Sequence, residues 1–201
     1  MRTKYRILFP GLLVSLLLSS PGQAEPVGRV VEQAGTVFLV QGGTAAALSP
    51  GSEVGAEDRV VTAAGGKLVI RFEDGSLCTI GPDSELLLAD LDAQHGGWLD
   101  LIHGIVRLIL SPGTRAAESG VRTRAAVASV RSTEFVVDAR LDHAAVFVAQ
   151  GTVTVTGRLT GASVTLEAGE GTDVGLREPP TPPKRWGDKR VQDVTARTTL
   201  P

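Results

Sequence analysis

The fold class is decided by one stretch of the sequence, Lys67-Leu68-Val69-Ile70-Arg71-Phe72-Glu73-Asp74-Gly75-Ser76-Leu77-Cys78-Thr79-Ile80. Two apolar runs flank Asp74-Gly75. An Asp-Gly pair between such runs is a strong β-hairpin signal, because a type I′ turn needs positive φ at both positions. A two-residue turn places Phe72 opposite Leu77. Because side chains alternate between the two faces of a strand, we expect four residues to point into the core: Leu68, Ile70, Phe72 and Leu77.

Short apolar runs separated by turn residues continue through the rest of the domain. Between Val27 and Val174, short apolar runs are separated by Gly, Asp and Pro at the spacing typical of an all-β domain. A glycine followed by a β-branched run occurs three times, at Gly35–Val40, Gly104–Ile109 and Gly151–Thr156. The composition, with 24 Gly and 4% aromatic residues, also favours strands and turns over a helical bundle. We therefore predict an all-β domain, a compact β-sandwich or β-roll, over residues 25–176.

The N-terminus predicts export. Met1–Arg6 carries three basic residues, Ile7–Leu18 is an apolar stretch, and Gly22-Gln23-Ala24 has the small-residue pattern of a cleavage site. This combination is typical of a secretory signal peptide over residues 1–24. An uncleaved anchor is the alternative, but about twelve helical residues reach only ~18 Å of a ~30 Å hydrocarbon core. We expect a periplasmic protein that does not span the membrane after cleavage.

The composition changes after Gly175. Residues 177–201 begin with a proline-rich run, Glu178–Pro183, which is followed by the basic residues of Lys184-Arg185-Trp186. The prolines favour an extended spacer. The basic segment either docks on the domain or on a partner, or stays solvated, and its terminal position favours a solvated tail.

Charge and cysteine content exclude other classes. The chain has 20 Lys and Arg against 22 Asp and Glu, so it lacks the excess positive charge of a nucleic-acid binder. Cys78 is the only cysteine, which rules out an internal disulfide. No basic residue flanks it directly, so we interpret Cys78 as a half-buried strand residue rather than a redox thiol.

No catalytic constellation is visible. The three histidines, His95, His103 and His143, are scattered and form neither a His-Glu-x-x-His pair nor a zinc-type cluster with cysteine. No nucleophile stands beside a base that a third group orients. The glycine pairs lack the Gly-Lys-Ser/Thr ending of a phosphate loop. We predict a protein that is not an enzyme, with no catalytic residue, no metal site and no cofactor.

A series of short sequence segments, taken in their order along the chain, resembles the FecR domain family of bacterial envelope proteins. The segments that carry the resemblance are Asp58–Thr62, Leu68–Ser76, Ile80–Leu86, Leu101–Val106, Val121–Thr123, Ala126–Val137 and Val148–Val153. The resemblance covers roughly residues 28–175. It departs from the family at Ser132, where members commonly have Gly. Well-known members also join the domain, across a membrane-spanning helix, to a cytoplasmic segment that controls a sigma factor, and we expect neither here.

The resemblance implies a recognition role in envelope signal sensing, through contact with an envelope or periplasmic protein. Arg131 and Glu134 interrupt the apolar strand Val127–Val137, either as part of a recognition surface or as an outward-facing ion pair. The candidate recognition surface comprises five residues: Arg131, Ser132, Thr133, Glu134 and Trp186. The alternative function is a structural scaffold that binds cell-wall glycan or another polymer through Trp98 and Trp186.

Overall fold

A computed structural model describes residues 26–91, 97–111 and 119–200. The predicted signal peptide and His95 lie outside these residues. The strands are β1 (Pro26–Ala34), β2 (Val37–Gln41), β3 (Thr44–Ala47), β4 (Glu53–Gly55), β5 (Arg59–Thr62), β6 (Lys67–Phe72), β7 (Leu77–Ile80), β8 (Ser84–Leu87), β9 (Trp98–Ile109), β10 (Ser119–Arg122), β11 (Ala126–Ala139), β12 (His143–Gly157), β13 (Ser163–Glu167), β14 (Glu170–Gly175) and β15 (Lys184–Arg185). One helix, α1 (Asp188–Arg197), follows them.

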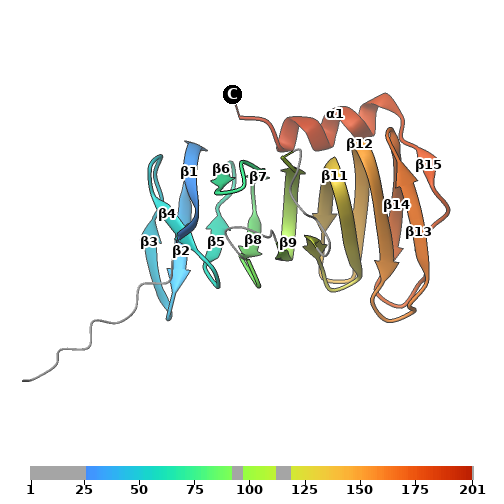
Figure 1. The fold of residues 1–201 in the computed structure, drawn as a ribbon, viewed down its shortest axis with the longest axis horizontal. Helices are drawn as coiled ribbons and strands as arrows, with labels where there is room; N and C mark the ends of the chain where they lie inside the picture. The colour runs from blue at the N-terminus through green and yellow to red at the C-terminus, as the bar shows by residue number, and fades with distance from the viewer. Residues whose placement is uncertain (1–25, 92–96, 112–118, 201) are drawn as a thin grey trace, which may run out of the picture.

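The strands form two layers that share three long strands, and they advance in roughly chain order along the molecule (Figure 1). Layer A has the pairing order β4-β1-β6-β7-β9-β11-β12-β14-β15. Layer B has the order β3-β2-β5-β8-β9-β10-β11-β12-β13. Strands β9, β11 and β12 each run through both layers. One half of each strand pairs with neighbours in layer A, and the other half pairs with neighbours in layer B. The prediction of a compact all-β fold is confirmed.

The glycines that precede the three β-branched runs lie where the chain passes from one layer to the other. Gly35, Gly104 and Gly151 have φ values of +65°, +98° and +85°, a region that side chains with a Cβ rarely adopt. At Gly104 a Cβ would lie 2.1 Å from Ser84 Oγ and 2.4 Å from Ser84 Cα. Glycine is therefore needed there both for the backbone turn and for the close approach of β8.

The main core lies between the two layers. It combines inward-facing residues of layer A, such as Ile70 and Phe135, with those of layer B, such as Leu86 and Leu101. Cys78 belongs to this core and is fully buried, and burial raises the pKa of its thiol to about 12. The interpretation of Cys78 as a packed strand residue thus fits the structure, although its burial is complete rather than partial.

The hairpin forms where the sequence predicts it, but its register is shifted by one residue. The Phe72 N–H donates to Ser76 O at 2.9 Å and the Gly75 N–H donates to Phe72 O at 3.0 Å, so the loop has three residues. Gly75 has φ +84°, as the bulge position of such a loop requires. Ile70 therefore faces Cys78. A one-residue slip exchanges the faces of the second strand, so Cys78 is buried and Leu77 is only partly buried.

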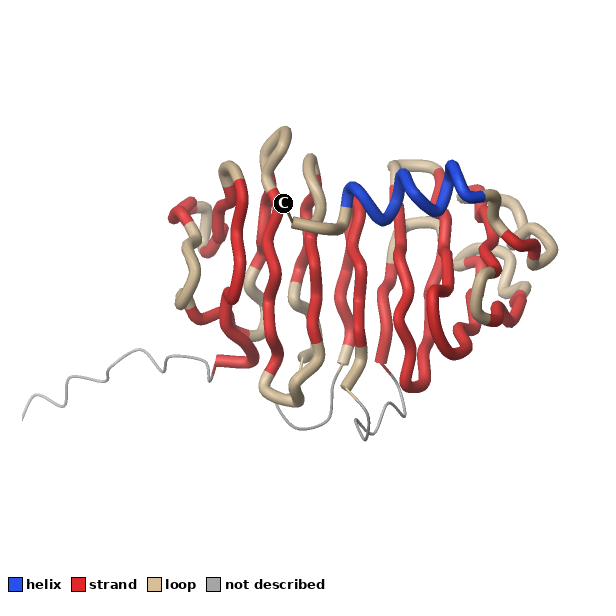
Figure 2. Tube along the Cα trace, turned by 90° about the horizontal axis from the view of Figure 1, so that it is seen from above, coloured by secondary structure: helices blue, strands red, loops and turns tan. Residues whose placement is uncertain are grey.

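The C-terminal segment differs from the expected solvated tail. Residues 186–200 lie across the outer face of layer A, and α1 crosses several of its strands (Figure 2). Val194 and Trp186 pack on a second apolar cluster formed by Ile105, Val136, Ala145 and Phe147. At the far end, Lys67 on β6 donates to the carbonyl oxygens of Ala196 at 2.7 Å and Thr199 at 2.5 Å.

The sequence contains little signal for this helix. Its only apolar residues are Val191, Val194 and the small Ala196, too few for a periodic pattern, and its N-cap, Gly187, makes no side-chain cap hydrogen bond. The helix is held by tertiary contacts with layer A, as is common for short helices. Among the residues that the structure describes, no helix is long and apolar enough to span a membrane.

Candidate functional site

The residues predicted around position 132 lie where β11 passes from layer B to layer A. The pairing of β11 with β12 is irregular between Arg131 and Glu134, so the strand bends there. The side chains of Arg131 and Ser132 lie outside the described part of the structure. Thr133 is buried, and Glu134 forms an ion pair with Arg107 of the neighbouring strand β9, whose Nε lies 3.0 Å from Glu134 Oε1.

This ion pair is a cross-strand contact on the outer face of layer A. About a quarter of each side chain is exposed, 25% for Arg107 and 22% for Glu134. Pairs of this kind contribute less than about 1 kcal/mol to stability. Glu134 thus has a partner on β9, which sequence spacing alone does not reveal.

Trp186 is the anchor of the C-terminal segment. Only 8% of it is exposed, its ring stacks on Phe147 with a centroid distance of 5.1 Å, and the Arg190 guanidinium lies 3.6 Å from the ring centroid. Its Nε1 is buried without a hydrogen-bond partner. A Cβ at Gly171 would come within 2.3 Å of Nε1, so that glycine admits the indole. The ring is not an open platform for stacking a sugar.

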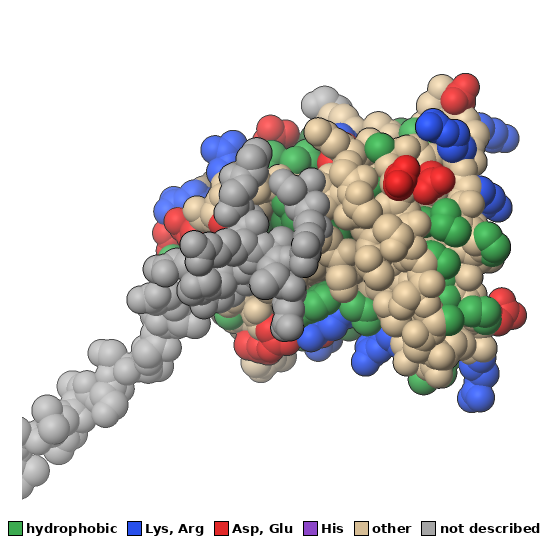
Figure 3. All heavy atoms as spheres, turned by 45° about the vertical axis from the view of Figure 1, so that its right-hand side comes forward, with side chains coloured by type: hydrophobic (Ala, Val, Ile, Leu, Met, Phe, Trp, Pro, Cys, Tyr) green, Lys and Arg blue, Asp and Glu red, His purple; other side chains and the backbone are tan. Residues whose placement is uncertain are grey.

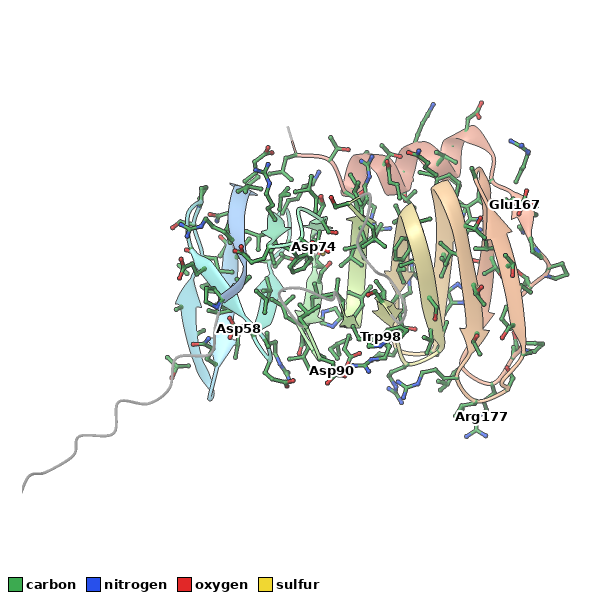
Figure 4. The ribbon with its side chains drawn as sticks, viewed as in Figure 1. Asp58, Asp74, Asp90, Trp98, Glu167 and Arg177 are labelled. Atoms are coloured by element: carbon green, nitrogen blue, oxygen red, sulfur yellow. The ribbon has the colours of Figure 1, made fainter. Side chains whose placement is uncertain are left out.

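Trp98 also contacts a neighbouring side chain, that of Arg122. The Arg122 guanidinium lies 5.5 Å from its ring centroid, and Arg122 forms ion pairs with Asp100 at 2.5 Å and Asp90 at 3.0 Å. The hydrogen bond that Arg122 donates to Asp100 is the main cause that raises the pKa of Arg122. Figure 4 shows Trp98 and Asp90 at the same end of the strands, far along the chain from Trp186. The two tryptophans therefore stand in separate interactions.

Two hollows adjoin α1. One of about 470 Å³ is lined by Asp83, His103, Arg140 and Leu141, and one of about 330 Å³ by His143, Trp186 and Arg190; both also touch Asp138, Arg140 and Arg197. Ion pairs beside the hollows join the helix to layer A. Arg197 pairs with Asp138, and Arg190 Nη1 lies 3.0 Å from Asp173 Oδ2.

These ion pairs shift the pKa values of Asp173 and Arg197. The hydrogen bond from Arg190 is the largest cause that lowers the pKa of Asp173. Burial is the largest single influence on the pKa of Arg197 and lowers it, but the hydrogen bonds and charges of Asp138 and Asp193 together outweigh burial and raise that pKa overall. His143 Nε2 lies 3.4 Å from Asp173 Oδ1. Over the described ranges, no group of three His, Cys, Asp or Glu residues could hold a metal ion.

The sequence analysis missed a second surface, at the β2–β3 end of layer B. We call it the edge patch and define it by five apolar residues on the outer face of that layer: Phe38, Val40, Ala45, Ala47 and Val61. Arg59 lies opposite Val40 on the same face, at the β5 side of the patch, in an ion pair with Glu85 at 2.6 Å. Ala45 and Ala47 are exposed, and the other three are partly exposed. A sequence signal for it exists, because Val37-Phe38-Leu39-Val40 is apolar on both faces where one solvated face predicts alternation.

Charge does not gather on the surface that Figure 3 shows. Lys and Arg side chains and Asp and Glu side chains are interspersed around its margin, with no field of one sign. A nucleic-acid interface needs clustered positive charge. This view gives no support to nucleic acid as a partner.

Comparison with known proteins gives a family match and two similar solved structures. The model of the FecR protein family matches residues 58–154, which run from the start of β5 into β12. Two crystal structures of a candidate anti-sigma factor from Parabacteroides distasonis ATCC 8503 have TM-scores of 0.55 and 0.54 and 17% sequence identity. Each alignment covers 67% of this chain and 62% of the other, so at this identity the likeness shows the fold. No curated protein matches the chain.

Residues 58–154 therefore match the FecR family model, and the resemblance predicted from the sequence is confirmed over that range. Strands β1 to β4, β13 to β15 and α1 lie outside the matched residues. Of the edge patch, only Val61 falls within the match.

Proposed function

We propose that this FecR-domain chain is a non-catalytic, periplasmic recognition module that acts in envelope signal sensing by binding an envelope or periplasmic protein. The observation that carries the proposal is the FecR match over residues 58–154. The fold likeness to a candidate anti-sigma factor supports a regulatory role. The N-terminal signal-like sequence supports export.

The described surface suits recognition better than catalysis. The histidines described, His103 and His143, face carboxylates at 3.8 Å and 3.4 Å, and neither is hydrogen-bonded to a serine, threonine or cysteine among the described residues. Cys78 is fully buried and its thiol pKa is raised, which keeps it protonated and out of reach. Binding through a surface requires none of these groups to be activated.

The glycan-scaffold alternative finds no support in the tryptophans. Sugar stacking needs an open aromatic face, whereas Phe147 and Arg190 lie against Trp186, and Arg122 lies over Trp98. We therefore favour a protein partner.

The test is chemical crosslinking of the tagged full-length protein in its own cells at native abundance, followed by mass spectrometry of the adducts. A variant that lacks residues 179–201 is the matched comparison. The proposal predicts a recurrent envelope or periplasmic protein among the adducts of the full chain. Retention on purified cell-wall sacculi without any protein adduct would refute it and support the scaffold.

A further inference from the structure

The two ends of layer B differ in the chemistry of their outer faces. Among the described residues, β13 at one end pairs with β12 alone, and the outer faces of these strands carry hydroxyls, with Thr156 Oγ1 and Ser163 Oγ 2.8 Å apart. At the other end β3 pairs with β2 alone within the same described ranges, and the outer face carries the apolar edge patch. A solvated sheet face is normally polar, so the β13 end is ordinary and the β3 end is not.

The free backbone groups of β3 can be assigned from its hydrogen bonds. The Leu48 N–H donates to Val37 O at 3.1 Å, and bonding alternates along an antiparallel ladder. Thr44 and Ala46 therefore bond to β2, whereas Ala45 and Ala47 direct their N–H and C=O groups away from it. Two residues with one donor and one acceptor each leave four backbone groups on the open edge.

Nothing in β3 protects this edge. Natural edge strands are usually blunted by charged side chains, proline or a bulge, because an open ladder invites another strand. Residues 44–47 read Thr-Ala-Ala-Ala, and their pairing with β2 is regular. By contrast, the edge of layer A at the same end carries Glu53 on β4, in an exposed ion pair with Arg29 at 2.7 Å.

We propose that the edge patch binds an extended, uncharged segment of a partner protein, which adds to layer B as a further strand beside β3. This inference rests on the proposed function and names its binding site and the class of ligand. Backbone bonds to Ala45 and Ala47 hold the segment. Its alternate residues, apolar or β-branched, lie on the outer face beside Ala45 and Ala47, whose small side chains leave Phe38 and Val40 within reach one strand further in, as in other strand additions.

Size favours a peptide segment over a second copy of the chain. A stable protein–protein interface buries about 1,200–2,000 Å². The open edge is only four residues long and its side chains are methyl groups and one threonine, which is too little for a lasting dimer. A single extended segment needs only the edge and the patch behind it. The lack of charge on β3 matches an uncharged ligand, because an unpaired charge buried there would be costly.

The test starts from a phage-displayed library of random heptapeptides, selected against the purified full-length protein. The best peptide is then titrated against the wild type and two edge variants, Ala45→Pro and Ala47→Lys. Proline at position 45 removes an outward N–H without breaking a bond to β2. Thr165→Pro is the matched control, because the Gly157 N–H bonds to Ala162 O at 2.9 Å, so alternation turns the Thr165 N–H outward on β13.

We expect enriched peptides with β-branched or aromatic residues at alternate positions. Both edge variants should weaken binding about tenfold or more, since each loses a backbone bond or gains an unpaired charge, and Thr165→Pro should leave it unchanged. N-methylation of successive peptide amides should weaken binding at every second position only, because alternate N–H groups face β3.

Three results would overturn the inference. One is the absence of any enriched peptide; another is binding that both edge variants retain. The third is a wild-type dimer in analytical ultracentrifugation that Ala47→Lys converts to monomer, which would make a second copy the occupant.

If circular dichroism shows that Ala45→Pro unfolds the domain, the binding measured with Ala47→Lys alone tests the edge site. In-cell protein adducts that persist in Ala47→Lys would remove the edge site and leave the proposed function standing, whereas no adducts from the wild type would remove the function.

Discussion

Replacing Gly104 by alanine should destabilise the protein by about 2–5 kcal/mol. Gly104 has φ +98°, and forcing a residue with a Cβ into positive φ costs about 1–2 kcal/mol. The new methyl would also lie 2.4 Å from Ser84 Cα, so packed backbone must shift, which costs a further 1–3 kcal/mol. Gly65→Ala is the control, because Gly65 has φ +76° but a Cβ there meets nothing within 4 Å. Its cost should be the backbone part alone, about 1–2 kcal/mol.

Urea unfolding followed by far-ultraviolet circular dichroism measures both variants. The Gly104 variant should lose about 1–3 kcal/mol more than the Gly65 variant, which corresponds to a further drop of several degrees in the melting temperature. Equal losses for the two variants would refute the reasoning, because they would mean that β9 can move away from Ser84 at no cost where it passes between the layers.

Three further predictions concern Cys78, Asp173 and Trp186. The Cys78 thiol should resist labelling by a disulfide reagent at pH 8 and react only at the rate of unfolding, because burial raises its pKa to about 12; immediate labelling would contradict this. The pKa of Asp173 is lowered by its bond to Arg190, so the stability from this pair should be complete above the ordinary aspartate pKa, near pH 3.9, and lost as the pH falls through the lower folded value. Fluorescence of Trp186 in a Trp98→Phe background should show that acid transition, and Arg190→Met should shift it upward in pH. Trp186→Ala should cost about 3–5 kcal/mol and speed proteolysis before α1, as measured by mass spectrometry of the fragments.

Several parts of the fold are predictable from the sequence because local chemistry specifies them. The hairpin around Asp74-Gly75 and the glycine phrases at Gly35, Gly104 and Gly151 follow from turn residues between apolar runs. The exact register does not follow, because Asp-Gly fits both a two-residue and a three-residue loop. Tertiary packing selects the register that buries Cys78.

The C-terminal segment and the site contacts depend on residues far apart in sequence. Lys67 bonds to carbonyls near position 199, Glu134 pairs with Arg107, and Trp186 packs on Phe147. Periodicity and spacing carry no information on such pairs. The apolar run of β2 was the one local signal for the edge patch, and its meaning depends on knowing that β3 has no second neighbour within the described residues.

The most direct test of the central claim, that this chain recognises a partner protein through the edge patch, is site-specific photo-crosslinking in living cells. A photo-crosslinking amino acid is placed at Ala45, and in a separate strain at Thr165 on the opposite edge of layer B. Recognition through the edge patch predicts a discrete protein adduct from position 45 and none from position 165. The absence of an adduct from position 45, or the same adducts from both positions, would contradict it.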